Sequence, residues 1–386
     1  MTLRLEDTTA AEVASEIRKE RHRLGAAGTG MVMTLIIIAD EENQNDASLA
    51  ASYSAGEHPC RILTVIPRPG RGESRLDAAI SVGENDGPGE LVRLRLRGPL
   101  AAHGYSIVLP LLLSDTPVVA WWPSAHPVRP SDDPLGALAT RRIIDTASDG
   151  RPFAALASMK ANLVSGDTDL AWTRITPWRS ALAAVLDQPY DPIISAEVRG
   201  QANPSAPLLR TWLEWRLGVP VSYHRSRGPA ITDVILKTTT GDIAIRRPDG
   251  HLATVERAGT AVKELYLPRR DLTELTAEEL RRLDPDDTYE QTMARLQTDS
   301  LSPTVASRSR VRAPDSLKST RKKKTSAAVE AQSVADKPTK KRRTKNAAGS
   351  ADSAAGAATS TAFPRRARHN AERAADAAID NQKGDE

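Results

Sequence analysis

Apolar and polar positions alternate with two different periods over the first 150 residues, which predicts strands separated by helices. The run Met31–Ala39 is apolar on both faces apart from Thr34, a pattern typical of a buried strand. Over Leu91–Leu96 the residues Val92, Leu94 and Leu96 share one face and Leu91, Arg93 and Arg95 the other, so we expect a half-exposed antiparallel strand at a sheet edge. Thr9 and Glu12 have the spacing of a capping box and predict a helix start. This order of elements favours an α/β fold with packed helices and a mixed, mainly parallel sheet.

The pattern changes near residue 191 and predicts a smaller α+β domain. A helix is expected over Ser205–Leu217, because its apolar residues share one face and a glycine follows it. Four short strands are expected within Pro220–Leu267, and two capped helices after them, one beginning at Thr276 and one after Asp284 and Pro285. We therefore expect an α/β domain over 1–150, a helical connection over 151–190, the α+β domain over 191–300 and a tail over 301–386.

The predicted tail differs from the rest of the chain in charge and composition. Lys and Arg outnumber Asp and Glu by 10 in residues 301–386, whereas the whole chain has a net charge of +4, so the preceding part is acidic. The tail holds almost no large apolar side chains, and we expect it to be disordered. Basic clusters within 308–345 predict weak contact with nucleic acid or another polyanion. No aromatic residues interleave with them, so a solubilising tail is the favoured alternative.

The sequence lacks the motifs of common enzyme classes. Cys60 is the only cysteine, which excludes an intrachain disulfide and a cysteine zinc site. The neighbouring His58 and Arg61 are compatible with a thiol of low pKa, but a buried residue at a strand start is the favoured alternative. The glycines at 25–30 follow a helix and precede a strand, the reverse of a dinucleotide-binding loop. No apolar run approaches the roughly 20 residues that span a bilayer. We therefore expect a cytoplasmic protein that is not an enzyme and needs no cofactor or metal.

The segment Asp169–Arg179 concentrates aromatic and arginine side chains in a protein that is only 4% aromatic. Thr176 is expected to cap a helix whose first residue is Pro177. Guanidinium groups beside a helix start can hold an anion or the carboxylates of a partner. The candidate residues of this segment are Trp172, Arg174, Trp178 and Arg179.

Two further clusters offer candidate binding residues. Trp121 and Trp122 lie in a predicted strand that Pro123 ends, so their rings belong either to the core or to a ligand site at the sheet edge. The segment LATRRIID can form a phosphate or carboxylate clamp or a surface ion pair. It adds Arg141, Arg142 and Asp145 to the candidate partner- or anion-binding residues.

Five segments, taken in order, resemble one family, the glucose-6-phosphate dehydrogenase assembly protein OpcA of cyanobacteria and actinobacteria. They are HPCR (58–61), TPVVAWWP (116–123), RRIIDTA (141–147), DLAWTRITPWR (169–179) and PSAPLLRTWLEWRL (204–217). The resemblance covers about residues 1–300. It implies a non-catalytic assembly factor or allosteric activator that binds glucose-6-phosphate dehydrogenase and supports NADPH production in the oxidative pentose phosphate pathway.

Two functions of other classes stay open at this point. The first is a sugar-phosphate-binding sensor or enzyme that uses the arginines as a clamp. The second is a nucleic-acid-associated protein that acts through its basic tail. The candidate residues themselves rest on aromatic and arginine clustering, which is typical of interface hot spots, and not on the family.

Overall fold

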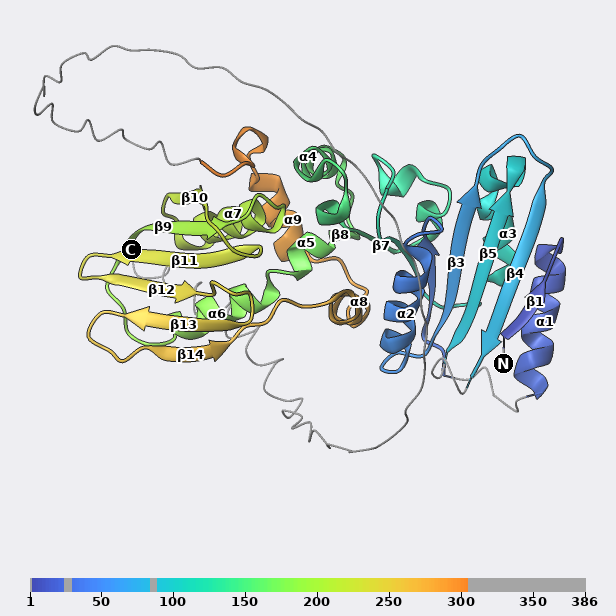
Figure 1. The fold of residues 1–386 in the computed structure, drawn as a ribbon, viewed down its shortest axis with the longest axis horizontal. Coiled ribbons are helices and arrows are strands. Elements are labelled where there is room, and N and C mark those ends of the chain that lie inside the picture. The colour runs from blue at the N-terminus through green and yellow to red at the C-terminus, as the bar shows by residue number, and fades with distance from the viewer. Residues whose placement is uncertain (1, 24–29, 84–88, 305–386) are drawn as a thin grey trace, which may run out of the picture. The chain divides into compact units, whose positions relative to one another are not determined.

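The computed structural model describes residues 2–23, 30–83 and 89–304, which form two β-sheets with helices packed against them (Figure 1). The α/β fold class predicted from the sequence is confirmed. From residue 305 on, the predicted tail lies outside the described residues, and so does the polyanion contact predicted for 308–345. Most of the glycine run at 25–30 lies outside them as well.

The first sheet has eight strands and is mixed. In spatial order they are β1 (Thr2–Leu5), β4 (Arg75–Val82), β5 (Glu90–Arg97), β3 (Cys60–Arg68), β2 (Met33–Ile38), β6 (Val118–Trp122), β7 (Arg141–Ile144) and β8 (Asp167–Asp169). The pairs β1–β4 and β4–β5 are antiparallel, and every pair from β5 to β8 is parallel. A mainly parallel sheet is therefore confirmed.

Strand β5 corrects the prediction of an edge strand over Leu91–Leu96. It lies inside the sheet, antiparallel to β4 and parallel to β3. Arg93 and Arg95 lie on one face of β5, and on this face Arg95 donates to Glu41 at 3.1 Å. The alternation therefore indicates that one face of β5 is polar, but it does not show which strands pair with β5.

Helices cover both faces of the first sheet. Helix α1 (Ala10–Arg23) begins with the predicted capping box, because the Glu12 N–H donates to Thr9 Oγ1 at 3.2 Å and the Thr9 N–H donates to Glu12 Oε2 at 3.0 Å. It packs on one face with α3 (Gly104–Val108) and α4 (Pro152–Asn162), and α2 (Gln44–Ala55) packs on the other. Each face therefore has its own apolar layer.

The second sheet has six strands and is mainly antiparallel. In spatial order they are β10 (Val221–Arg225), β9 (Ile193–Gly200), β11 (Ile231–Thr238), β12 (Asp242–Arg246), β13 (Leu252–Arg257) and β14 (Lys263–Tyr266). Only β9 and β10 are parallel, and α7 (Ser205–Leu217) connects them with the bounds predicted from the sequence. Within Pro220–Leu267 the structure has five strands where four were expected, and the last of them, β14, is short and mostly exposed.

Two helices follow the second sheet. Helix α8 (Leu272–Leu280) begins four residues before the predicted Thr276, because Asp271 and Glu274 form a capping box of the same spacing. Helix α9 (Asp287–Arg295) begins after Pro285 as predicted, with Asp286 as its N-cap. Leu275 and Leu280 of α8 pack in the same apolar layer as α2. Helix α8 therefore packs on an element from the first part of the chain, whereas α9 packs against α7.

The region predicted as a helical connection contains one strand of the first sheet. Within 151–190 the structure has α4, then β8, then α5 (Leu170–Thr173) and α6 (Thr176–Leu186). The domain boundaries at residues 150 and 190 stay a prediction.

Candidate functional site

The tryptophan–arginine segment begins where β8 ends. Asp169 caps α5, because its carboxylate accepts the Ala171 N–H at 2.8 Å. Pro177 lies in the first turn of α6, as expected. The predicted cap at Thr176 is wrong, because Ile175 occupies the N-cap position and the Thr176 hydroxyl donates to Glu278 of α8 at 2.7 Å. The Thr176 hydroxyl thus acts as a donor to a carboxylate of a distant helix, and the structure shows no backbone N–H of α6 donating to it.

The four candidate tryptophans are buried, with at most 2% of any of them exposed. Trp121 and Trp122 point into the two opposite apolar layers of the first sheet, as side chains of successive strand residues must. Trp172 and Trp178 belong to the same connected group of buried apolar residues as Trp122, and this group also includes residues of the second sheet. These rings therefore belong to the core, which was one of the two alternatives for the tryptophan pair.

Trp172 is held by three different contacts. Its indole N–H donates to Asp286 at 2.8 Å, and its ring lies 5.6 Å from the ring of Tyr289. The Arg179 guanidinium lies 4.1 Å from the Trp172 ring centroid, within the range of a cation–π contact. The ring thus joins α5 to α6 and α9.

Each candidate arginine of the LATRRIID segment forms a buried ion pair. Arg141 donates to Glu279 of α8 at 2.5 Å and also to the Asp284 carbonyl. Arg142 pairs with Asp167 and donates to two backbone carbonyls. These contacts support the ion-pair alternative over an open anion clamp, although the pairs are buried and not at the surface.

Asp145 holds Arg174 in a bidentate pair. Both carboxylate oxygens of Asp145 accept from Arg174 at 2.7 Å, and Asp145 also accepts from the Ser148 hydroxyl at 2.7 Å. Of the nine candidate residues, only Arg174 and Arg179 are not buried, and 29% of the Arg174 side chain is exposed. The predicted role of all nine residues in binding a partner or an anion stays a prediction.

Asp169 is the most perturbed acid of the segment. Burial, and then the charge of Asp145, raises its pKa to about 6 from an ordinary 3.8. Its Oδ2 accepts from the Thr146 hydroxyl at 2.5 Å, and its Oδ1 accepts the Thr146 and Ala171 N–H groups. Because the side chain is fully buried, no substrate can reach this acid in the structure.

The raised pKa of Asp169 predicts a pH dependence of stability. Between about pH 4 and pH 6 the folded protein keeps a proton on Asp169 that the unfolded chain releases, so the free energy of unfolding falls as pH rises. The Asp169→Asn variant retains an acceptor for both N–H groups and lacks this titration. We expect the free energy of unfolding of the parent, relative to the variant, to fall by about 2 kcal/mol from pH 4 to pH 7 in urea titrations. A difference that stays constant with pH would contradict the prediction.

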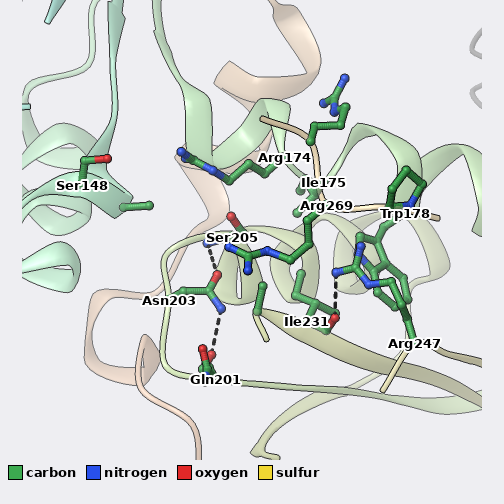
Figure 2. Close-up of a pocket in the computed structure, with 14 residues that line it drawn as sticks. Ser148, Arg174, Ile175, Trp178, Gln201, Asn203, Ser205, Ile231, Arg247 and Arg269 are labelled. Atoms are coloured by element: carbon green, nitrogen blue, oxygen red, sulfur yellow. Dashed lines mark hydrogen bonds between the residues drawn. The ribbon is translucent and has the colours of Figure 1, made fainter. Parts of the chain in front are cut away.

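Arg174 also lines a cavity of about 270 Å³ that sequence analysis did not identify. Figure 2 shows the cavity residues, which come from the loop after β7, the starts of α6 and α7, and the ends of strands in the second sheet. Four arginines line it and no Asp or Glu does: they are Arg174, Arg247, Arg269 and Arg270. The polar remainder includes Ser148, Gln201, Asn203 and Ser205.

A sequence signal for the missed arginines exists but is weak. Two pairs of adjacent arginines, each beside a proline, flank the β13–β14 hairpin. They are Arg246-Arg247-Pro248 and Pro268-Arg269-Arg270. An antiparallel hairpin returns the chain to the end at which it started, so two such flanking pairs are placed close together. Neither pair belongs to an aromatic cluster, which is the pattern on which the candidate residues rest.

Other chemistry in the described part of the chain is limited. Cys60 is buried at the start of β3, and burial raises the pKa of its thiol to about 12, which confirms the expectation of a buried strand residue. Residues 2–23, 30–83 and 89–304 contain no group of three His, Cys, Asp or Glu side chains placed to hold a metal ion. No helix within the same ranges is long and apolar enough to cross a membrane.

Comparison with known protein families identifies two adjoining matches. Residues 51–161 match the model described as the glucose-6-phosphate dehydrogenase subunit N-terminal domain, of the OpcA assembly type. Residues 165–293 match the corresponding C-terminal domain. Together the two matches span more than half of the chain. A search of curated proteins gave no significant match.

Solved structures give only distant likenesses. A 3-ketoreductase from Actinomadura kijaniata has 10% sequence identity and a TM-score of 0.38, covering 70% of this chain and 96% of that one. A dehydrogenase from Clostridium difficile has 6% identity and a TM-score of 0.37, covering 68% and 96%. A biliverdin reductase from Synechocystis has 8% identity and a TM-score of 0.30, covering 69% and 97%. Similarity at this level carries no argument about activity.

Proposed function

The chain belongs to the OpcA family of glucose-6-phosphate dehydrogenase subunits, and from this membership we propose that it is a non-catalytic subunit that binds this dehydrogenase. The two adjoining family matches carry the proposal, because both domains are described as parts of a subunit of that enzyme. The subunit promotes assembly or activity of the dehydrogenase and thereby supports NADPH production in the oxidative pentose phosphate pathway.

The contacts of the candidate segment support a non-catalytic role. Its most perturbed acid, Asp169, is fully buried, and its neighbour Asp145 already holds Arg174. A general acid or base must lie within hydrogen-bond reach of a substrate proton, which a fully buried group does not. The charged side chains around β7 and β8 thus stabilise the fold.

An activator of this kind works by binding one state of the dehydrogenase more tightly than another. Of the predicted contact residues, Arg174 and Arg179 have side chains that are partly accessible to such a partner. We propose these two as the contacting groups of the segment. The buried residues act by positioning them: Asp145 orients Arg174, and the Trp172 ring supports Arg179.

The proposal predicts a physical complex with altered kinetics. We expect the purified chain to co-elute from a sizing column with the glucose-6-phosphate dehydrogenase of its own source. In the same preparation the rate of NADPH formation should change when the chain is added. Two folded proteins that neither co-elute nor alter the rate would overturn the proposal.

The same assay distinguishes residues of the candidate segment that contact the dehydrogenase from residues that only position them. We expect the Arg179→Ala variant to weaken co-elution, while Arg71→Ala, which removes an exposed arginine in the turn between β3 and β4, leaves it unchanged. Arg174→Ala is less suitable, because it leaves the buried Asp145 carboxylate without its partner. Circular dichroism of each variant verifies that it is folded.

A further inference from the structure

The arginine-lined cavity carries more positive charge than its surroundings neutralise. Arg174 is paired with Asp145, and Arg270 donates to Glu278 of α8 and to the Thr173 carbonyl. Arg247 and Arg269 are different: among the residues that the structure describes, neither guanidinium has a carboxylate partner. Two unpaired positive charges therefore face one small cavity.

The Arg247 guanidinium is buried and is held in place by hydrogen bonds to backbone carbonyls. Only 4% of the residue is exposed, and its guanidinium donates to the Leu267 and Ile231 carbonyls, both at 2.9 Å. The group lies 4.9 Å from the Trp178 ring centroid, as Figure 2 illustrates. These contacts use two of its five N–H donors, and the buried Nε has no hydrogen-bond partner in the described structure.

Burial without a carboxylate partner changes the pKa of Arg247. Burial, and then the charge of Arg269, lowers the pKa of Arg247 to about 10. The Asp249 carboxylate acts in the opposite direction and partly offsets this lowering of the Arg247 pKa. Asp249 makes no ion pair with Arg247 and instead accepts the backbone N–H groups of His251 and Leu252 at 2.8 and 3.1 Å. A bound anion would relieve the cost of this burial, because it neutralises a charge that is already desolvated.

We propose that this cavity binds the phosphate group of a small organic molecule, with Arg247 and Arg269 as the two charge-bearing ligands. A phosphate monoester carries nearly two negative charges at neutral pH, which matches the two unpaired guanidinium groups. Arg174, one of the two proposed dehydrogenase contacts, also lines this cavity, but the charge-bearing ligands proposed here are Arg247 and Arg269. Phosphate binding is measured on the chain alone, so its failure is distinguishable from a failure to bind the dehydrogenase.

The neighbouring groups fit the same ligand. Helix α6 begins at Thr176 after Ile175, helix α7 begins at Ser205, and both Ile175 and Ser205 line the cavity. The N-terminal end of a helix favours negative charge. In Figure 2 the Arg269 side chain extends in the direction of Asn203 and Ser205. A cavity of about 270 Å³ exceeds one phosphate ion and leaves room for a short polar carbon chain.

Calorimetric titration of the full chain with inorganic phosphate, and then with glycerol 3-phosphate, tests the proposal. Ionic strength is held constant with sodium chloride in all titrations. We expect saturable binding of both probes, with glycerol 3-phosphate binding at least as tightly as phosphate. Arg269→Ala should weaken binding about tenfold or more, since it removes a charge-assisted contact. Arg269 is exposed and has no side-chain partner in the described structure, so the variant is expected to fold.

Matched variants make each result decisive. Arg71→Ala removes the same charge from an exposed turn outside the cavity and should change the affinity by less than about twofold. Arg269→Glu should abolish saturable binding. Equal affinities in the parent and Arg269→Ala would place the anion elsewhere on the chain and overturn the proposal. Lack of saturable phosphate binding, or exclusion of glycerol 3-phosphate, would overturn it as well.

Discussion

Replacing Glu279 by alanine is expected to lower the free energy of unfolding by about 3–5 kcal/mol. Glu279 of α8 accepts from Arg141 of β7 and from the Thr173 hydroxyl, both at 2.5 Å, and the Arg141 and Glu279 side chains are 5% and 6% exposed. Removing the carboxylate leaves a buried guanidinium with only the Asp284 carbonyl as a partner. Denaturant titration of the parent and the variant measures the loss.

Two control variants define what the Glu279 result means. Arg281 follows the last residue of α8 and pairs at the surface with Glu57, which follows α2, so Arg281→Ala should cost less than about 1 kcal/mol. The double variant Arg141→Met, Glu279→Leu removes both charges together and should be more stable than Glu279→Ala, because no unpaired charge stays buried. If Glu279→Ala and Arg281→Ala cost the same, the pair is not desolvated in solution.

Replacing Trp172 by alanine is expected to cost about 3–5 kcal/mol of unfolding free energy. The variant loses the packing against Tyr289, the support of Arg179 and the hydrogen bond to Asp286. Trp172→Phe keeps most of the ring packing and should cost only about 1–3 kcal/mol, mainly through the lost bond to the Asp286 carboxylate. Thermal and denaturant unfolding of both variants gives the comparison.

Trp215 provides the matched control for Trp172. Its ring is only half-buried and lies against Arg216 and Arg295, so Trp215→Ala should cost clearly less than Trp172→Ala. A Trp172→Ala variant with parental stability would show that packing of this ring contributes little to folding. That result would contradict its place in the core.

Patterns of apolar and polar residues predicted helices and strands well where a short run of sequence is enough to identify the buried face. The apolar run Met31–Ala39 contains β2, and the position of Trp121 and Trp122 in one strand correctly implied that their rings enter opposite layers. The place of β5 inside the sheet was not predictable, because alternation reports how polar a face is and not which strands lie beside it.

The charged contacts were less predictable, because their partners lie far away in sequence. Arg141 pairs with Glu279, 138 positions later, and Thr176 donates to Glu278, 102 positions later. Sequence inspection identified arginines as candidate anion ligands but could not show that those beside β7 already have carboxylate partners. The two unpaired arginines of the cavity, Arg247 and Arg269, lie in none of the three predicted clusters.

The packing of α8 on α2 has a consequence for how the chain acquires its structure during synthesis. Helix α2 and strand β7 leave the ribosome long before Leu275 and Glu279, the residues that cover the apolar side of α2 and neutralise Arg141. Until then a nascent chain with a complete first sheet exposes an apolar helix face and carries an uncompensated arginine. The core on this face of the first sheet is thus completed only after nearly the whole described chain has been translated. Before α8 is synthesised, the apolar face of α2 is a defined target for a chaperone that shields apolar surface.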